Sequence, residues 1–76
     1  MNLKSYGANQ TEITLGNELK VFFSYETPVT AYDDLAGKYF RTSKFWSKTT
    51  SKHINNWLDG EPAEMREQDF FNSLVR

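Results

Sequence analysis

The sequence holds one histidine, His53, and histidine is the side chain best suited to acid–base chemistry near neutral pH. Hydroxyl and carboxyl groups that could complete a nucleophile site with it are Ser51, Asp33, Asp34 and Asp59. Such sites are defined by geometry, and no nucleophile-elbow motif is present. In the first turn of a predicted helix, His53 is instead expected to cap the helix, pack against Trp57 or face solvent. We therefore expect a protein that is not an enzyme.

Ligands for metals and cofactors are equally scarce. There is no cysteine, and one histidine cannot make the converging set that zinc requires. Asp33-Asp34 precede Leu-Ala-Gly and do not match an EF-hand loop, so we expect them to stabilise a solvated β-turn. Neither glycine-rich phosphate-binding motif occurs. The sequence therefore predicts no metal site and no cofactor.

A stronger signal is the segment 38–58, which contains basic and aromatic residues and no acid. Cationic side chains that hold phosphates beside rings that stack on bases are typical of proteins that bind single-stranded nucleic acid. On that interpretation the binding residues are Tyr39, Arg41, Lys44, Trp46, Lys48 and Lys52. The alternative is structural, because about half of the aromatic side chains on any strand must face inward. The acidic stretch 59–69 either neutralises this segment within the fold or makes the surface dipolar.

The start of the predicted helix is a second candidate for ligand binding. Free N–H groups in the first turn of a helix attract anions. Here they lie among hydroxyl groups and between Lys48 and Lys52, so a small anion or ligand site would use Thr49, Thr50, Ser51 and His53. We rank this ligand site below binding of a protein and below binding of nucleic acid.

Length and composition limit the partners. Seventy-six residues predict a single domain, 1–76, in which residues 1–10 are loosely held or form a short edge strand. Twelve aromatic residues supply the large side chains that so small a core needs. The net charge of -1 argues against a general polyanion binder. The longest apolar run, residues 21–23, is far too short for a membrane span, so we expect a soluble protein with no membrane partner.

The first half of the chain has the period of β-strands. Residues 12–15 alternate, Gly16-Asn17 follows, and then Leu19, Val21, Phe23 and Tyr25 alternate with more polar positions. Two alternating runs joined by Gly-Asn predict a hairpin. Thr27-Pro28 predicts a bend or a sheet edge, and further strands are expected at 29–32 and 38–42, separated by a turn at 33–37. Residues 45–47 are expected to continue the last strand or to form another.

The second half has helical signals. Hydroxyl groups at residues 47–51 can cap a helix whose apolar stripe is Ile54, Trp57 and Leu58 and which ends at Asp59-Gly60. A second short helix is predicted from Phe70, Phe71, Leu74 and Val75, after an extended segment at Met65. The predicted fold class is α+β, a small curled antiparallel β-sheet of three to five strands with one or two short C-terminal helices packed on one face.

Residues 25–29 (YETPV) and 47–55 (SKTTSKHIN), with the DFFNSL tail, resemble a family of small uncharacterised proteins from bacteriophages and phage-like elements. The likeness covers about residues 20–75, and Thr30 stands where a small apolar residue is expected. The resemblance brings no activity and no catalytic residues. It implies a viral origin and action in the host cytoplasm.

Together these observations favour a non-enzymatic, phage-encoded binding protein whose partner is a host or phage protein. Inhibition of a host system such as antiviral defence is one role open to it. An exposed edge strand near Pro28 that adds to a partner's sheet is one possible mode. The alternative is the single-stranded nucleic-acid module of segment 38–52, and the least favoured is the ligand site at the helix start.

Overall fold

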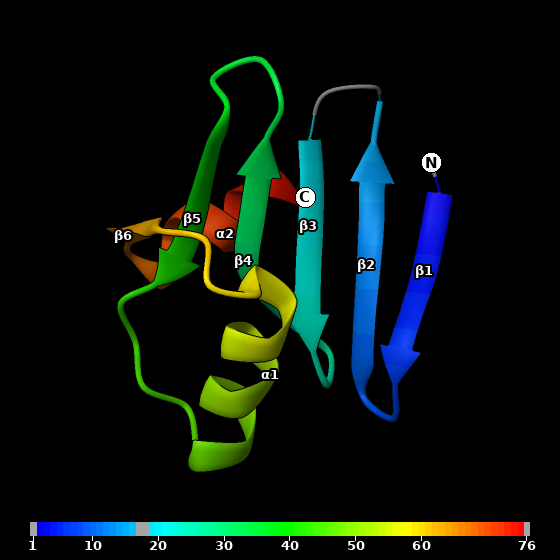
Figure 1. Cartoon of the computed structure of the whole chain (residues 1–76), viewed down its shortest axis with the longest axis vertical. Helices are drawn as coiled ribbons and strands as arrows, with labels where there is room; N and C mark the ends of the chain where they lie inside the picture. Colours follow the sequence, from blue (N-terminus) through cyan, green and yellow to red (C-terminus); the bar gives the residue numbers. More distant parts are fainter. Residues whose placement is uncertain (1, 17–18, 76) are drawn as a thin grey trace.

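The computed structural model describes residues 2–16 and 19–75. Six strands form one sheet in the order of the sequence (Figure 1). They are β1 Asn2–Gly7, β2 Gln10–Leu15, β3 Leu19–Ser24, β4 Thr27–Asp33, β5 Lys38–Thr42 and β6 Ala63–Arg66. The helices are α1 Lys48–Leu58 and α2 Gln68–Leu74. Neither helix is long and apolar enough to cross a membrane.

The alternating residues form the hairpin that the sequence predicts. β2 pairs antiparallel with β3, and Leu15 lies opposite Leu19. Gly16 adopts the left-handed backbone expected of the turn, whereas Asn17 lies outside the described residues. The strands expected at 29–32 and 38–42 and the turn between them are also confirmed, as β4 and β5.

Pro28 does not lie at a sheet edge, because β4 is an interior strand. It pairs with Phe23 of β3, and the β4–β5 ladder begins only at Thr30 opposite Arg41. The proline is thus tolerated where no neighbour on the β5 side needs its missing N–H. The register shifts by one residue at Val29, a β-bulge that bends the strand here.

The first strand, β1, pairs with β2, so the edge-strand alternative for the N-terminal residues is the one observed. At the other edge, β6 pairs parallel with β5. A parallel pair needs a crossover connection, and α1 provides it. Met65 lies on this extended segment, as expected, but residues 45–47 form no strand and instead connect β5 to the helix.

The helix α1 lies where the capping residues and the apolar stripe predict it. Ser47 is the N-cap, and its Oγ accepts a hydrogen bond of 3.1 Å from the backbone N–H of Thr50. At the other end Asp59 and Gly60 both have left-handed backbones, which ends the helix. The second helix covers most of the predicted stripe, with Phe71 fully buried.

The α+β class is confirmed, but the sheet has six strands and one parallel pair. The two helices also lie on opposite faces of the sheet (Figure 1). Under α1 the buried cluster is Phe22, Val29, Ile54 and Leu58, and under α2 it is Ala31, Phe40 and Phe71. Consecutive residues of a strand face opposite sides, and Val21 and Phe22 are both fully buried, so both faces of β3 are covered.

Candidate functional site

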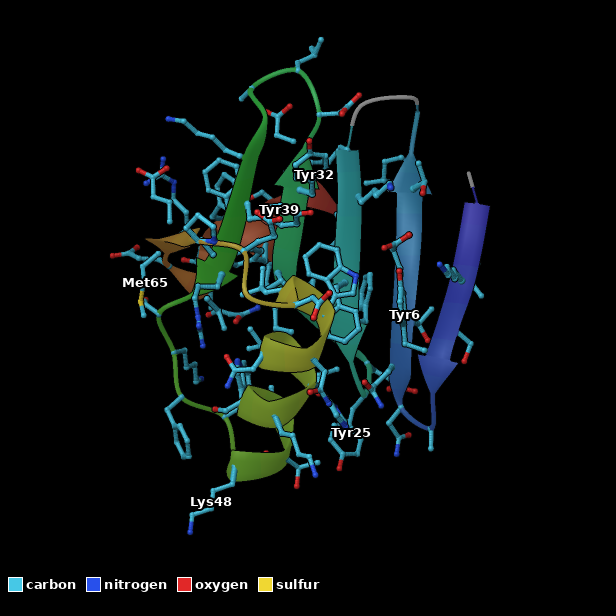
Figure 2. All side chains as sticks on the ribbon, in the orientation of Figure 1. Tyr6, Tyr25, Tyr32, Tyr39, Lys48 and Met65 are labelled. Carbon is cyan, nitrogen blue, oxygen red and sulfur yellow. The ribbon has the colours of Figure 1, made fainter. Side chains whose placement is uncertain are left out.

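Four aromatic side chains, one acid and one base surround a hollow on the face of the sheet that carries α1. We call it the tyrosine pocket; its volume is about 240 Å³, and it is lined by Tyr6, Glu12, Lys20, Tyr32, Tyr39 and Trp57. Figure 2 shows Tyr6, Tyr32 and Tyr39 on the side of the sheet where α1 lies. Each of the first five strands supplies one of these residues, and α1 supplies the sixth.

Strand register brings these side chains together. Lys20 lies opposite Tyr32, and Tyr32 lies opposite Tyr39, so the three form a row across β3, β4 and β5. Directly opposed residues in antiparallel strands project to the same face. Glu12 lies opposite Phe22, two residues along β3 from Lys20 and so on the same face as this row. A shift of one residue in any strand would send its pocket residue to the other face.

The aromatic rings pack against one another and fix the wall of the pocket. The Tyr32 and Tyr39 ring centroids are 4.5 Å apart, and Tyr39 meets Trp57 edge-on at 5.8 Å. Trp57 in turn stacks on the buried Phe22 at 5.4 Å. Rings in such tilted and edge-on arrangements stabilise each other beyond their buried area. The wall is therefore anchored in the core cluster beneath α1.

Glu12 is a nearly buried carboxylate inside this pocket. Its side chain is 7% exposed, and Oε1 accepts hydrogen bonds of 3.0 Å from the Tyr6 hydroxyl and from Trp57 Nε1. Among the described residues no lysine or arginine forms an ion pair with it, and its second oxygen, Oε2, accepts no hydrogen bond. A buried charge is normally paired with an opposite charge. Glu12 therefore brings to the hollow a carboxylate with no ion pair among the described residues, although Lys4 lies directly opposite it in the β1–β2 ladder and Lys20 lines the same hollow.

The pKa values of two tyrosines that line the pocket are raised. Burial, and then the hydrogen bond and charge of Glu12, raise the pKa of Tyr6 above its ordinary value. Loss of hydration and the nearby carboxylate of Asp34 raise the pKa of Tyr32, with Glu61 contributing. Both phenols are therefore neutral hydrogen-bonding groups at physiological pH.

A second hollow adjoins the first. It has a volume of about 580 Å³ and shares Tyr32 and Tyr39 with the tyrosine pocket. Its other lining residues come from the β4–β5 turn and the segment that leads into β6: Gly37, Lys38, Glu61, Pro62, Ala63 and Glu64. The two tyrosines thus stand between two depressions on one surface.

The surroundings of His53 differ from those that the sequence predicted. It is buried, and its Nδ1 is 2.8 Å from Ser24 Oγ, which also donates to Thr50 Oγ1 at 3.1 Å. The ring contacts Tyr25 at 5.8 Å. The expectation that His53 caps the helix, packs on Trp57 or faces solvent is therefore wrong, because the polar Ser24 on β3 gives it a buried partner.

A serine hydroxyl this close to a histidine has the geometry of a nucleophile and its base. Ser24 is only 1% exposed, however, so a substrate has no path to its oxygen in this structure. Of the acids considered with His53, Asp33 accepts from the N–H groups of Leu35 and Ala36, and Asp59 is the C-cap of α1. The pair holds α1 to β3.

The six residues of the nucleic-acid hypothesis fall into separate groups. Tyr39 is in the pocket wall near the C-terminal end of α1, and Arg41 reaches Asn55 on that helix at 3.5 Å. Lys48 and Lys52 lie on the first turns of α1, and Figure 2 shows Lys48 at the end opposite Tyr39. Nine residues of helix span about 13 Å. Tyr39 and Lys48 thus do not share one stacking surface.

Lys44 and Trp46 do lie together. The Lys44 Nζ is 4.1 Å from the centroid of the Trp46 ring, a cation–π contact. The Trp46 Nε1 donates to Gln68 Oε1 at 3.0 Å, which fastens this loop to α2. Next to them, Phe45 is 69% exposed.

The residues of the helix-start hypothesis are divided between interior and surface. Thr50 and His53 face inward and bind Ser24, Thr49 is exposed, and Ser51 is partly buried. The Ser47 hydroxyl accepts the N–H of Thr50. One of the free first-turn donors that an anion would use is therefore already bonded.

Comparison with known proteins identifies a family. The model of a family described as a family of unknown function (DUF8033) matches residues 1–73, so the likeness includes the first hairpin. No curated protein and no solved structure matches the chain. The family match confirms the resemblance to an uncharacterised family and says nothing of a phage origin. The chain belongs to the DUF8033 family.

Proposed function

We propose that this chain is a non-enzymatic binding protein that acts by docking on another protein through the face that carries α1. The observation that supports this most directly is the tyrosine pocket, in which Tyr32, Tyr39 and Trp57 border a hollow with a nearly buried carboxylate at Glu12. Tyrosine and tryptophan are the residues that most often dominate protein interfaces, since they bury a large area at low entropic cost.

The proposal extends to a phage origin, action in the host cytoplasm and a host or phage protein as the partner, with inhibition of a host system such as antiviral defence as one outcome. These parts rest on the resemblance in residues 25–29 and 47–55. Finding the gene within a prophage or phage genome supports them, and finding its relatives only among bacterial housekeeping genes contradicts them.

The binding proposal is tested by capture from bacterial lysate with and without nuclease. We expect a protein to be retained after nuclease treatment and to be lost with Tyr32→Ala, because truncating an aromatic anchor at an interface weakens binding about 30-fold or more. The matched control is Phe45→Ala, which removes an exposed ring outside the pocket. Capture that disappears with nuclease, or that Tyr32→Ala leaves unchanged, contradicts the proposal.

A second candidate function is binding of single-stranded nucleic acid by the loop before α1. It is favoured by the exposure of Phe45 and Trp46 beside Lys44 and Lys48. Base stacking on such rings contributes about 1 to 3 kcal/mol per base. If oligonucleotide binding occurs, it should weaken with salt and be abolished by Lys44→Glu with Lys48→Glu. Binding that the double variant leaves untouched contradicts this candidate.

A further inference from the structure

We propose that the tyrosine pocket recognises a cationic side chain of the partner, an alkylammonium or guanidinium group, with Glu12 as the counter-charge. The inference rests on the proposed function and names the chemistry of the group bound. It draws on three properties of the pocket: its aromatic rings, its acid without an ion pair among the described residues, and its size.

Three of the four pocket rings carry none of the chain's own described cations. Cations are attracted to the faces of tryptophan and tyrosine rings, and several rings around one hollow are the usual site for ammonium groups. Lys4 lies over the pocket ring of Tyr6 at 4.8 Å, and outside the pocket Arg66 lies over Phe40 at 5.3 Å. No such contact is made by a described residue to Tyr32, Tyr39 or Trp57.

The acid supplies the charge that selects a cation over a neutral apolar group. Glu12 is 93% removed from solvent, with one oxygen bonded to Tyr6 and Trp57 and no ion pair within the described residues. Asp34 and Glu61 lie near Tyr32, and Glu61 lines the adjoining hollow. Entry of a cation would compensate the Glu12 charge and so offset the free energy lost by burying it.

Size favours a side-chain head group. Sites for whole drug-sized ligands span roughly 300 to 1,000 Å³. At about 240 Å³ the tyrosine pocket is smaller than that range, so it suits one charged group presented by a larger molecule.

Two lysines oppose this inference. Lys4 is exposed, lies opposite Glu12 in the β1–β2 ladder and covers the Tyr6 ring. Lys20 is exposed, lines the pocket and lies opposite Tyr32, yet it makes no ion pair with Glu12. Its positive charge repels an incoming cation. Lys20→Ala should therefore strengthen cation binding, and it also removes any chance that Lys20 itself occupies the site.

The test is titration of the intact chain with blocked amino acids, followed by NMR of the tryptophan indole N–H groups. The probes are N-acetyl methylamides of lysine, trimethyllysine and arginine, with norleucine as the neutral isostere. The Trp57 indole, which donates to Glu12, should shift in a saturable way with a cationic probe. The Trp46 indole, bonded to Gln68 outside the pocket, should not move and is the internal control.

Comparing the three charged probes distinguishes an ammonium from a guanidinium guest. Glu12→Gln keeps an amide oxygen for Tyr6 and Trp57 and removes only the charge, so cation affinity should fall about tenfold or more. Equal shifts with norleucine, undiminished affinity in Glu12→Gln, or no Trp57 shift even in Lys20→Ala would each overturn the inference. If partner capture is lost with Tyr32→Ala but retained with Glu12→Gln, the inference of a cationic guest is wrong and the proposed function still holds.

Discussion

Trp57 Nε1 donates a hydrogen bond of 3.0 Å to Glu12 Oε1 and thereby ties α1 to β2 across 45 positions of the sequence. The same indole stacks on Phe22, so one side chain joins the hydrophobic core under α1 to the polar floor of the tyrosine pocket. The stability of the fold and the shape of the candidate site therefore depend on the same residue, and variants must be chosen to separate the two.

Replacing Trp57 separates its packing from its hydrogen bond. Trp57→Ala loses the stack on Phe22 and leaves a cavity, so the free energy of unfolding should fall by about 3 to 5 kcal/mol. Trp57→Phe keeps a ring there but loses the donor to Glu12 and part of the packed volume, so a smaller fall of about 1 to 2 kcal/mol is expected. Urea unfolding measures both. If Trp57→Ala unfolds at the same urea concentration as the parent, α1 is not docked as described.

Two variants of Glu12 separate the effect of its hydrogen bonds from the effect of its charge. Glu12→Gln retains an acceptor for the Tyr6 hydroxyl and Trp57 Nε1, so stability should change by less than about 1 kcal/mol. Glu12→Leu leaves both donors without a partner and should lower the free energy of unfolding by about 1 to 3 kcal/mol. The measurement is denaturant unfolding of both variants, with Glu26→Gln as the exposed control. A stable Glu12→Leu protein would mean that water satisfies these donors.

The alternating hairpin could be predicted from the sequence because one feature, the period of two, fixes both the strands and their register. The assignment of faces failed at Phe22, Ser24 and Tyr25. The alternation suggested that Val21, Phe23 and Tyr25 share the core face, whereas Phe22 and Ser24 are buried and Tyr25 is half exposed at a tight turn with positive φ. A sheet covered on both faces has no polar side, so alternation no longer marks the core.

The candidate site could not be predicted from the sequence, for a related reason. Its residues come from five strands and a helix, and only the registers of four ladders bring them together. Glu12 looked like an outward charge in an alternating strand, Tyr32 looked like the end of a short strand, and Tyr39 was a candidate nucleic-acid-binding residue. Their grouping is set by the folded sheet and not by a local motif. The helix boundaries were predictable because capping is local.

Alkaline pH should destabilise the fold through the tyrosines. The pKa values of Tyr6 and Tyr32 are raised above 10.0, the value expected in the unfolded chain. A phenol with a raised pKa holds its proton more tightly when folded, so its contribution is complete below pH 10 and is lost as pH rises through the folded pKa. Urea midpoints from pH 8 to pH 11 should fall, and less steeply in Tyr6→Phe with Tyr32→Phe. Equal slopes in both proteins would contradict this.

Gln68 should be the most sensitive polar residue on the other side of the molecule. Its Oε1 accepts from Thr42 Oγ1 and Trp46 Nε1, and its Nε2 donates to Pro28 O and Asn72 Oδ1. One amide thus joins β4, β5, the loop before α1 and α2, with its hydrogen-bonding capacity fully used.

Gln68→Glu keeps the two accepted bonds but places a carboxylate oxygen against the Pro28 carbonyl and Asn72 Oδ1. We expect a fall of about 1 to 3 kcal/mol in the free energy of unfolding, because two acceptors then face each other without a proton. The matched control is Glu67→Gln, at an exposed position whose side chain makes no capping hydrogen bond. Lowering the pH should partly rescue Gln68→Glu, since a protonated carboxyl donates again. A variant as stable as the parent at neutral pH would show that Gln68 does not hold these four elements together.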